Sequence, residues 1–266
     1  MNRIVAAAVA ASLVAGCSSG RPIARDRIDR ALSIAPGEGQ PSKIVAAEVA
    51  MEQRARERGQ WSSFAQYAAP DAKIHLTSGP APAAAWLRGR RDPAQTASWE
   101  PRNVWISCDG SLAVSKGRYR AADGKVGDFV RIWQRSGENE YSWVHHLAAL
   151  DNPQPARRPA LPAAEGDEIV VTAIDSIKGF VADCPERGTA IPAAPPAAMP
   201  SDVPSDNTSA VISSRAASRD GTLAWRWEHD SASNRRIVAE YFSGGKWQIA
   251  LDERFIPDTG AALQDD

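Results

Sequence analysis

The chain has 266 residues, a formal net charge of −1, and Lys and Arg scattered among Asp and Glu. This length allows one large domain or two small ones. Because no basic stripe is present, the composition does not indicate a nucleic-acid partner. Nine Trp are many for such a chain, and we expect most of them to pack in a hydrophobic core.

The first 17 residues have the pattern of a secretory signal. One Arg precedes an apolar run that ends in the letters VAGC and is too short to span a bilayer permanently. This end resembles a bacterial lipoprotein signal, which implies cleavage before Cys17 and a stable lipid anchor on its sulfur. Since Ser18 follows instead of an aspartate, the resemblance implies the periplasmic leaflet of the outer membrane. The alternative is an ordinary cleaved signal with an incidental cysteine.

Changes in composition divide the rest of the chain. Proline lacks the amide donor that a sheet needs, so the proline-rich stretches indicate a linker and an exposed loop. We predict a tether at 18–40, a first domain at 41–150, a Pro-rich linker at 151–167, a β-rich extension at 168–257 with a Pro-rich loop near 185–206, and a disordered tail at 258–266.

The first domain opens on a helical pattern between Ser42 and Gly59. Apolar residues recur there at helical spacing, and charged residues form a second face. We expect the apolar face to be buried and the charged face to be solvated. The apolar set is Ile44, Ala47, Met51 and Ala55, and the charged set is Glu48, Glu52, Arg56 and Arg58. A short helix in WSSFAQYAA, a strand in AKIHLTS and a helix in PAPAAAWLRG follow in that order.

Three strand-like runs fill the stretch from Val104 to Leu150. They are VWISCDGSLAVSKGRYR, VGDFVRIWQR and YSWVHHLAAL, and short polar turns separate them. Val, Ile, Trp, Tyr and Phe suit a half-buried pleated surface. Asp123-Gly124 favours a tight hairpin in which both central residues have positive φ. The stretch therefore predicts an antiparallel meander.

The element order and the strings FAQYAAPDAKIHL, DGSLAVSKGRYR and FVRIWQRSGENEYSWVHH resemble a SnoaL-like domain of the nuclear transport factor two and ketosteroid isomerase superfamily. The resemblance covers about Ser42 to Leu150. It implies an α+β fold in which a curved antiparallel sheet wraps N-terminal helices and leaves a cone-shaped pocket. Many members are catalytically silent pockets or dimerisation modules, so the resemblance indicates architecture more than chemistry.

The extension is also predicted to be antiparallel β. Its alternation predicts one buried face, available to rest on the first domain, with Leu223, Trp225 and Trp227 on it. The string DGTLA at 220–224 echoes DGSLA at 109–113, and each opens a strand. This echo indicates either an internal repeat or the periodicity that any meander has.

Two cysteines remain after the leader, Cys108 and Cys184. In an oxidising periplasm two leftover thiols favour a disulfide, whereas a metal site would need further ligands at suitable spacing. We predict a Cys108–Cys184 disulfide, and the alternative is two buried thiols that never meet.

His145 and His146 are the first candidates for chemistry. Consecutive strand residues point to opposite faces, so only one can reach a pocket and the two cannot chelate one metal. In related domains the last strand often carries a histidine toward the cavity, whereas the alternative is a hydrogen-bonded histidine on a sheet face. His75 can join one of them, but the sequence suggests no third ligand, and we predict no metal.

An isomerase mechanism needs a carboxylate base and an acid in an apolar site. Asp128, within a predicted strand, is the candidate base, and Tyr67 and Tyr119 are the remaining partners, because Asp71 is better explained as a turn residue. The isomerase residues do not match this chain one by one. Phosphate loops, dinucleotide fingerprints and nucleophile elbows are absent from the sequence, so we predict no cofactor.

Five tryptophans of the first domain either line an apolar pocket or fill the core: Trp61, Trp86, Trp105, Trp133 and Trp143. The leading hypothesis is a non-catalytic, lipid-anchored periplasmic protein that binds a small apolar ligand or an envelope partner. One rival is an isomerase, cyclase or hydrolase that uses Asp128 and a histidine. Another is a structural homodimer formed through the open face of the sheet.

Overall fold

The computed structural model describes residues 38–137, 140–156, 176–185, 191–193 and 211–256, all within a unit that begins at Gly37. The predicted lipidation site Cys17 lies outside the described residues. So do the predicted tail and most of the predicted tether, linker and Pro-rich loop. None of the helices in the described ranges is long and apolar enough to cross a membrane.

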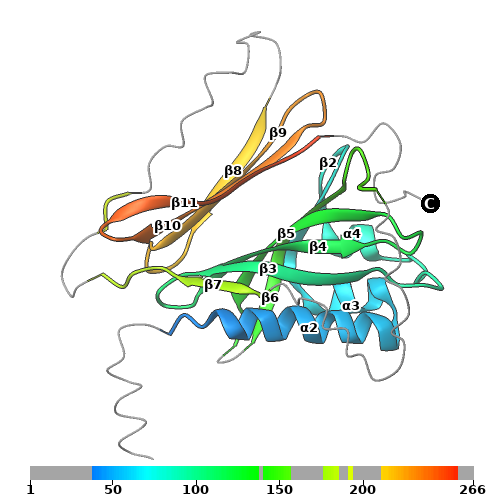
Figure 1. Ribbon diagram of the computed structural model, residues 1–266, viewed down its shortest axis with the longest axis horizontal. Helices are drawn as coiled ribbons and strands as arrows, with labels where there is room; N and C mark the ends of the chain where they lie inside the picture. Colours follow the sequence, from blue (N-terminus) through cyan, green and yellow to red (C-terminus); the bar gives the residue numbers. More distant parts are fainter. Residues whose placement is uncertain (1–37, 138–139, 157–175, 186–190, 194–210, 257–266) are drawn as a thin grey trace, which may run out of the picture. The chain divides into compact units, whose positions relative to one another are not determined.

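The described chain is a mixed α+β fold with few helices and one large curved sheet (Figure 1). The first half contains α2 (Pro41–Arg58), α3 (Gln60–Tyr67), β1 (Ala68–Leu76), β2 (Gly79–Pro82), α4 (Ala83–Leu87), β3 (Ser98–Ile106), β4 (Leu112–Arg120), β5 (Val126–Arg135) and β6 (Tyr141–Leu150). The second half contains β7 (Lys178–Val181), β8 (Ile212–Ala217), β9 (Leu223–His229), β10 (Arg235–Ser243) and β11 (Lys246–Phe255).

The first sheet has seven strands in the order β2-β1-β6-β5-β4-β3-β7. The meander β3 to β6 is antiparallel, as predicted, while β1 runs parallel to β6 and β7 parallel to β3. The edge strand β2 was not predicted, because its two prolines suggested the start of a helix; an edge strand tolerates them. The turn between β4 and β5 is also wider than predicted. It runs from Ala121 to Lys125, and within it only Gly124 has a positive φ, of 86°.

One face of the first sheet packs against α2, which lies along it (Figure 1). Ile44, Met51 and Ala55 are fully buried there, as the helical spacing predicts. The prediction for the charged face was wrong for Glu48 and Glu52, which are 0% and 8% exposed. The carboxylate of Glu48 is buried because donors from the sheet surround it.

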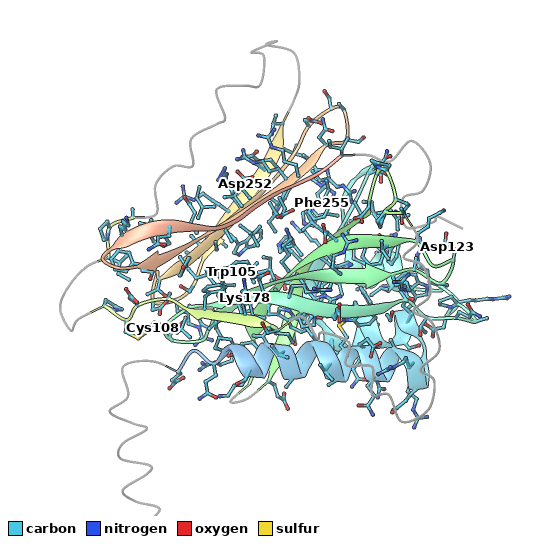
Figure 2. All side chains as sticks on the ribbon, in the orientation of Figure 1. Trp105, Cys108, Asp123, Lys178, Asp252 and Phe255 are labelled. Carbon is cyan, nitrogen blue, oxygen red and sulfur yellow. A yellow bond between two sulfur atoms is a disulfide. The ribbon has the colours of Figure 1, made fainter. Side chains whose placement is uncertain are left out.

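The other face of the first sheet packs against a second sheet of four strands, in the order β11-β10-β9-β8. Leu223, Trp225 and Trp227 alternate into this contact, as the pattern predicts. Trp105 and Phe255, both labelled in Figure 2, belong to the same buried cluster. The face that the homodimer hypothesis needed is therefore covered by the chain's own C-terminal strands.

The strands β8 to β11 form a second antiparallel meander, and the turn between its first two strands is of the same kind as the turn between β3 and β4. Residues 107–112 and 218–223 both read Ser-X-Asp-Gly-(Ser or Thr)-Leu. In each turn the first serine donates its hydroxyl to the aspartate and its backbone N–H to the leucine carbonyl, and the glycine has a positive φ. The four hydrogen bonds are Ser107 Oγ to Asp109 at 2.7 Å, Ser218 Oγ to Asp220 at 2.6 Å, Ser107 N to Leu112 at 2.9 Å and Ser218 N to Leu223 at 2.8 Å.

The two turns also bind each other reciprocally. The N–H of Cys108 donates to Thr222 Oγ1 at 3.0 Å, and the N–H of Arg219, its equivalent, donates to Ser111 Oγ at 3.1 Å. Equivalent strand pairs, β5 with β6 and β10 with β11, carry a register shift at equivalent positions. This geometry favours an internal repeat over chance periodicity.

A disulfide joins the end of the first meander's opening strand to the segment after β7. The Sγ atoms of Cys108 and Cys184 are 2.00 Å apart. The structure therefore brings together the two cysteines that the sequence paired.

Candidate functional site

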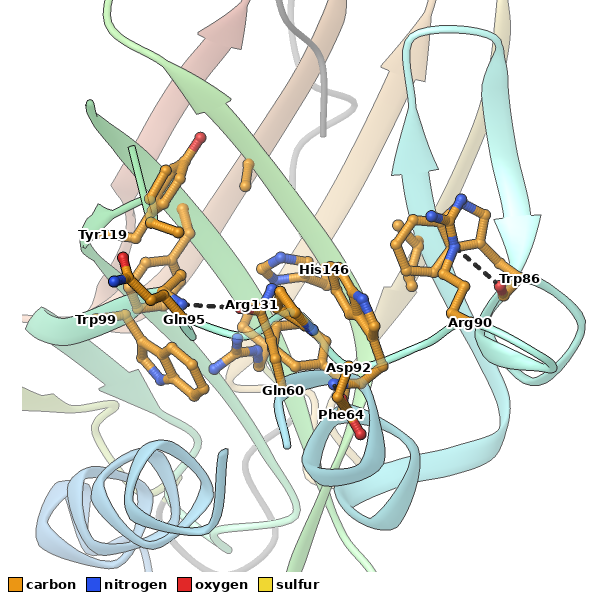
Figure 3. A pocket seen from close by; sticks show the side chains of 18 of the residues that line it. Gln60, Phe64, Trp86, Arg90, Asp92, Gln95, Trp99, Tyr119, Arg131 and His146 are labelled. Atoms are coloured by element: carbon orange, nitrogen blue, oxygen red, sulfur yellow. Dashed lines mark hydrogen bonds between the residues drawn. The ribbon is translucent and has the colours of Figure 1, made fainter. Parts of the chain in front are cut away.

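A cavity of about 460 Å³ opens between α3, α4 and the α2-facing surface of the first sheet (Figure 3). About a third of its lining residues are aromatic, and the rest are divided between aliphatic residues and charged or amide side chains. Apolar walls that carry polar groups are usual in a small-molecule site. Its lining includes Trp61, Phe64, Trp86, Arg90, Asp92, Trp99, Tyr119, Phe129, Arg131 and His146.

The aromatic walls hold one another in place through edge contacts. Trp61 meets Trp86 at 5.1 Å between ring centroids, with the planes at 89°. Phe64 meets Trp99 at 5.7 Å. The guanidinium of Arg90 stacks 3.8 Å over the ring of Trp86, so that wall carries a cation on its aromatic surface.

The structure separates the five candidate tryptophans into three groups. Trp61 and Trp86 line the cavity. Trp105 lies on the opposite sheet face and stacks on Phe180 at 5.5 Å. Trp133 and Trp143 are fully buried in the core, and their indole N–H groups donate to Glu48 and to the Phe64 carbonyl.

Sequence reasoning missed Trp99, which lines the cavity from β3. Trp99 and Trp105 are six residues apart, so a regular strand would place them on the same face. A register shift between Pro101 and Asn103 inserts one residue and reverses that alternation. Pro101, beside the inserted residue, is the signal in the sequence that could have indicated it, because proline within a strand occurs mainly at edges and bulges.

His146 and Arg131 form the polar end of the cavity; they are 5% and 1% exposed. The Nδ1 of the His146 ring is buried and has no hydrogen-bond partner among the described residues. Burial, followed by the nearby Arg131 charge, places the pKa of His146 well below its ordinary value, so the ring is neutral.

Arg131 is also incompletely paired. Its Nη1 bonds the buried carboxylate of Glu48, but its Nε finds no partner among the described residues. Glu48 in turn accepts hydrogen bonds from Ser115 Oγ at 2.6 Å and from the Trp99 indole at 3.1 Å. The carboxylate of Glu48 therefore uses its lone pairs within the protein and fixes the position of the Arg131 guanidinium.

Asp128 does not reach this cavity. Its side chain alternates to the opposite sheet face and pairs with Arg118, with 2.9 Å between Oδ1 and Nη1. Asp128 and His146 face opposite sides of the sheet. The hypothesis that these two residues converge on the pocket is therefore wrong. Tyr119 does line the cavity, and burial raises its pKa. Tyr67 and Asp71 are not among the lining residues.

Asp92 is the one carboxylate among the residues that line the cavity. It accepts hydrogen bonds from the backbone N–H groups of Trp61 and Ser62, at 2.5 and 3.2 Å, and from the Ser62 hydroxyl at 2.6 Å. These contacts satisfy amides at the start of α3. Asp92 is therefore a helix-capping group, poorly placed to act as a general base.

His145 points to the other sheet face, as the strand alternation predicts, and joins a row of three histidines. His75 Nε2 lies 2.8 Å from His145 Nδ1, and His75 Nδ1 lies 3.2 Å from His229 Nε2. One proton in each gap satisfies both contacts when all three rings are neutral. Because His75 uses both nitrogens, the three rings do not converge on one point. No group within the described ranges has the arrangement of a metal site.

No protein-family model matches the chain, and no curated protein is significantly similar to it in sequence. Among solved structures, it is similar to a nuclear transport factor 2-like superfamily protein from Salmonella enterica serovar Typhimurium, with 12% identity and a TM-score of 0.32 over 47% of this chain and 96% of that one. It is also similar to a CaMKII hub from S. rosetta, with 16% identity and a TM-score of 0.33 over 42% and 98% of the two chains. A third is a protein of unknown function from the DUF3225 family of Pectobacterium atrosepticum, with 14% identity and a TM-score of 0.32 over 42% and 93%.

Proposed function

We propose that this protein binds a small, largely apolar molecule in the aromatic cavity and does not transform it. In this proposal residues 41–150 form a cone-shaped SnoaL-like domain, and β8–β11 close its outer sheet face. The observation that carries the binding function is the aromatic cavity itself, whose walls are built from Trp61, Trp86 and Trp99.

The carboxylates in and near the cavity already bind other groups of the chain, and this supports binding over catalysis. A general base must reach the substrate with its lone pair available. Asp92 caps α3, Glu48 holds Arg131, and Asp128 lies on the other sheet face. His146 is the remaining candidate base, and burial lowers its pKa so far that it is a weak one.

Binding can be tested with N-phenyl-1-naphthylamine, a neutral fluorescent probe. We expect saturable binding at one site per chain. Trp86→Ala should weaken it by about fivefold or more, because an aromatic contact contributes about 1 kcal/mol beyond its buried area. Trp247→Ala is the matched control, since Trp247 lies on β11 outside the cavity, and it should leave the affinity unchanged. Non-saturable binding, or equal loss in both variants, would contradict the proposal.

We further propose that the protein acts in the cell envelope, anchored by a lipid on Cys17 in the outer membrane and facing the periplasm. The VAGC sequence at the end of the leader supports this location. Cys17→Ser should abolish metabolic labelling with a fatty acid and release the protein from the membrane fraction. Continued acylation of that variant would refute the anchor.

A further inference from the structure

We infer that the ligand of this cavity is an amphiphilic acid, which places an apolar body inside the cavity and a carboxylate at the open end beside Arg91. The inference rests on the proposed binding function and names the chemical class of the ligand. It is carried by the way in which exposure and charge divide the residues that line the cavity.

The deep part of the cavity suits a hydrocarbon. Its buried lining residues with apolar side chains are Phe64, Ile74, Phe129 and Ala148. Two polar residues are buried among them, but neither presents an uncompensated charge. Glu48 pairs with Arg131, and the ring of His146 is neutral. The apolar end of a ligand therefore gains most by lying here, where it is removed from water.

The open end of the cavity is formed mainly by one segment, residues 88–97, between α4 and β3. The exposed lining residues are Arg91, Asp92, Pro93, Gln95 and Ala122. All of them except Ala122 lie on this segment, and three of the five are charged or carry an amide. The end of a ligand that lies among them meets water and polar side chains, so that end is polar.

The charges on this segment favour an anion at that end. Asp92 binds backbone amides at the start of α3, where the helix dipole already compensates its charge. Arg90 is fixed on the wall, because its Nε donates to the Trp86 carbonyl at 3.2 Å while its guanidinium stacks on that ring (Figure 3). Arg91 forms no ion pair within the described ranges and is open to solvent. A guanidinium so placed can bind a carboxylate through two parallel hydrogen bonds.

The test compares three probes that share one hydrocarbon chain and differ in the charge of the end group: decanoate, 1-decanol and decylammonium. Each is titrated at pH 7.5 and low ionic strength against the protein loaded with N-phenyl-1-naphthylamine. We expect decanoate to bind about three- to fivefold more tightly than decanol, because an exposed ion pair contributes up to about this factor. Decylammonium should bind more weakly than decanol.

A pair of variants on the same segment assigns this preference to one residue. Arg91→Gln should reduce the preference for decanoate over decanol to less than twofold. Arg88→Gln is the matched control, because Arg88 is also exposed but does not line the cavity, and it should leave the preference unchanged. Because Arg91 is exposed, its substitution should not prevent folding, and the wild-type comparison of the three probes stands without it.

Decanoate that binds no more tightly than decanol, or decylammonium that binds most tightly, would overturn the inference. An equal loss of preference in Arg88→Gln and Arg91→Gln would overturn it too, since the net charge of the segment would then be responsible. Each of these results leaves the proposed function standing, because N-phenyl-1-naphthylamine still binds. If none of the three probes displaces that amine, the ligand class is wrong and the binding function stands. If the amine itself does not bind, the proposed function is wrong.

Discussion

Lowering the pH from 7 to 4.5 should reduce the free energy of unfolding by several kcal/mol. The chain has four histidines, and each has a pKa below its ordinary value in the folded protein. Desolvation is the largest cause in all four. Below pH 6.5 the unfolded chain therefore takes up protons that the folded chain refuses, and the equilibrium shifts toward unfolding.

The size of the effect follows from His145, whose pKa falls to about 4. Its contribution to stability is fully present above pH 6.5 and is lost progressively as the pH falls toward 4. One pKa unit corresponds to about 1.4 kcal/mol, so this residue alone accounts for up to about 3 kcal/mol. Its neighbours partly oppose each other, since the charge of Lys73 lowers the pKa and that of Asp71 raises it.

The other members of the row add to this loss. Arg235, which donates to the backbone carbonyl of His75 at 2.7 Å, lowers the pKa values of both His75 and His229. Asp230 raises the pKa of His229, but less than burial lowers it. Protonation of His75 would put a second cation beside Arg235 and remove the acceptor from one of its two histidine contacts.

Urea unfolding at pH 7, 6, 5 and 4.5 measures this dependence. The slope of the unfolding free energy against pH reports how many more protons the unfolded chain binds. Below pH 6.5, His145→Phe should lower this slope by up to about 1.4 kcal/mol per pH unit, which corresponds to one proton, whatever its effect on stability at pH 7. Phe suits the site because His145 packs on the Trp225 ring at 4.4 Å. A free energy of unfolding that is the same at pH 5 as at pH 7 would show that the histidines titrate alike in both states.

The strands of this protein were predictable because their alternation is local. Leu223, Trp225 and Trp227 occupy every second position, so their burial follows from the pleat alone. The disulfide was predicted from two cysteines left in a chain whose leader predicts an oxidising compartment, and the structure contains it. In both cases the sequence contains the information that determines the structure.

The cavity was less predictable because its residues depend on register. One inserted residue in β3 places Trp99 in the cavity and Trp105 against the second sheet, although both positions have the same parity. The direction of Asp128 likewise depended on which face of β5 meets the helices. Alternation defines two faces but does not say which of them lines a pocket.

The burial of Glu48 could not be predicted from the local sequence either. A glutamate among charged neighbours on a helix suggests a solvated face, and nothing local contradicts that interpretation. Its burial depends on Arg131, Trp133 and Ser115, which lie more than sixty residues away in the chain. A charged side chain is buried only when it is paired, and here side chains of the first sheet donate the hydrogen bonds that Glu48 accepts.

Glu48→Gln should lower the free energy of unfolding by about 3–5 kcal/mol. The substitution keeps the size of the side chain and one acceptor oxygen but removes the charge. Arg131 would then be a buried guanidinium without a counter-ion, and breaking a buried pair on one side costs this amount. The loss should be visible in urea unfolding at pH 7 as a lower midpoint with an unchanged slope.

The double variant Glu48→Gln with Arg131→Met separates charge from packing. Since both charges are then absent, it should lose less stability than the sum of the two single variants, with a coupling energy of about 2–3 kcal/mol. Glu57→Gln is the matched control, because Glu57 lies exposed on the same helix, and it should change stability by less than about 0.5 kcal/mol. If Glu48→Gln costs no more than this control, the buried pair does not hold α2 to the sheet. In that case Arg131 does not depend on Glu48 for its position at the end of the cavity.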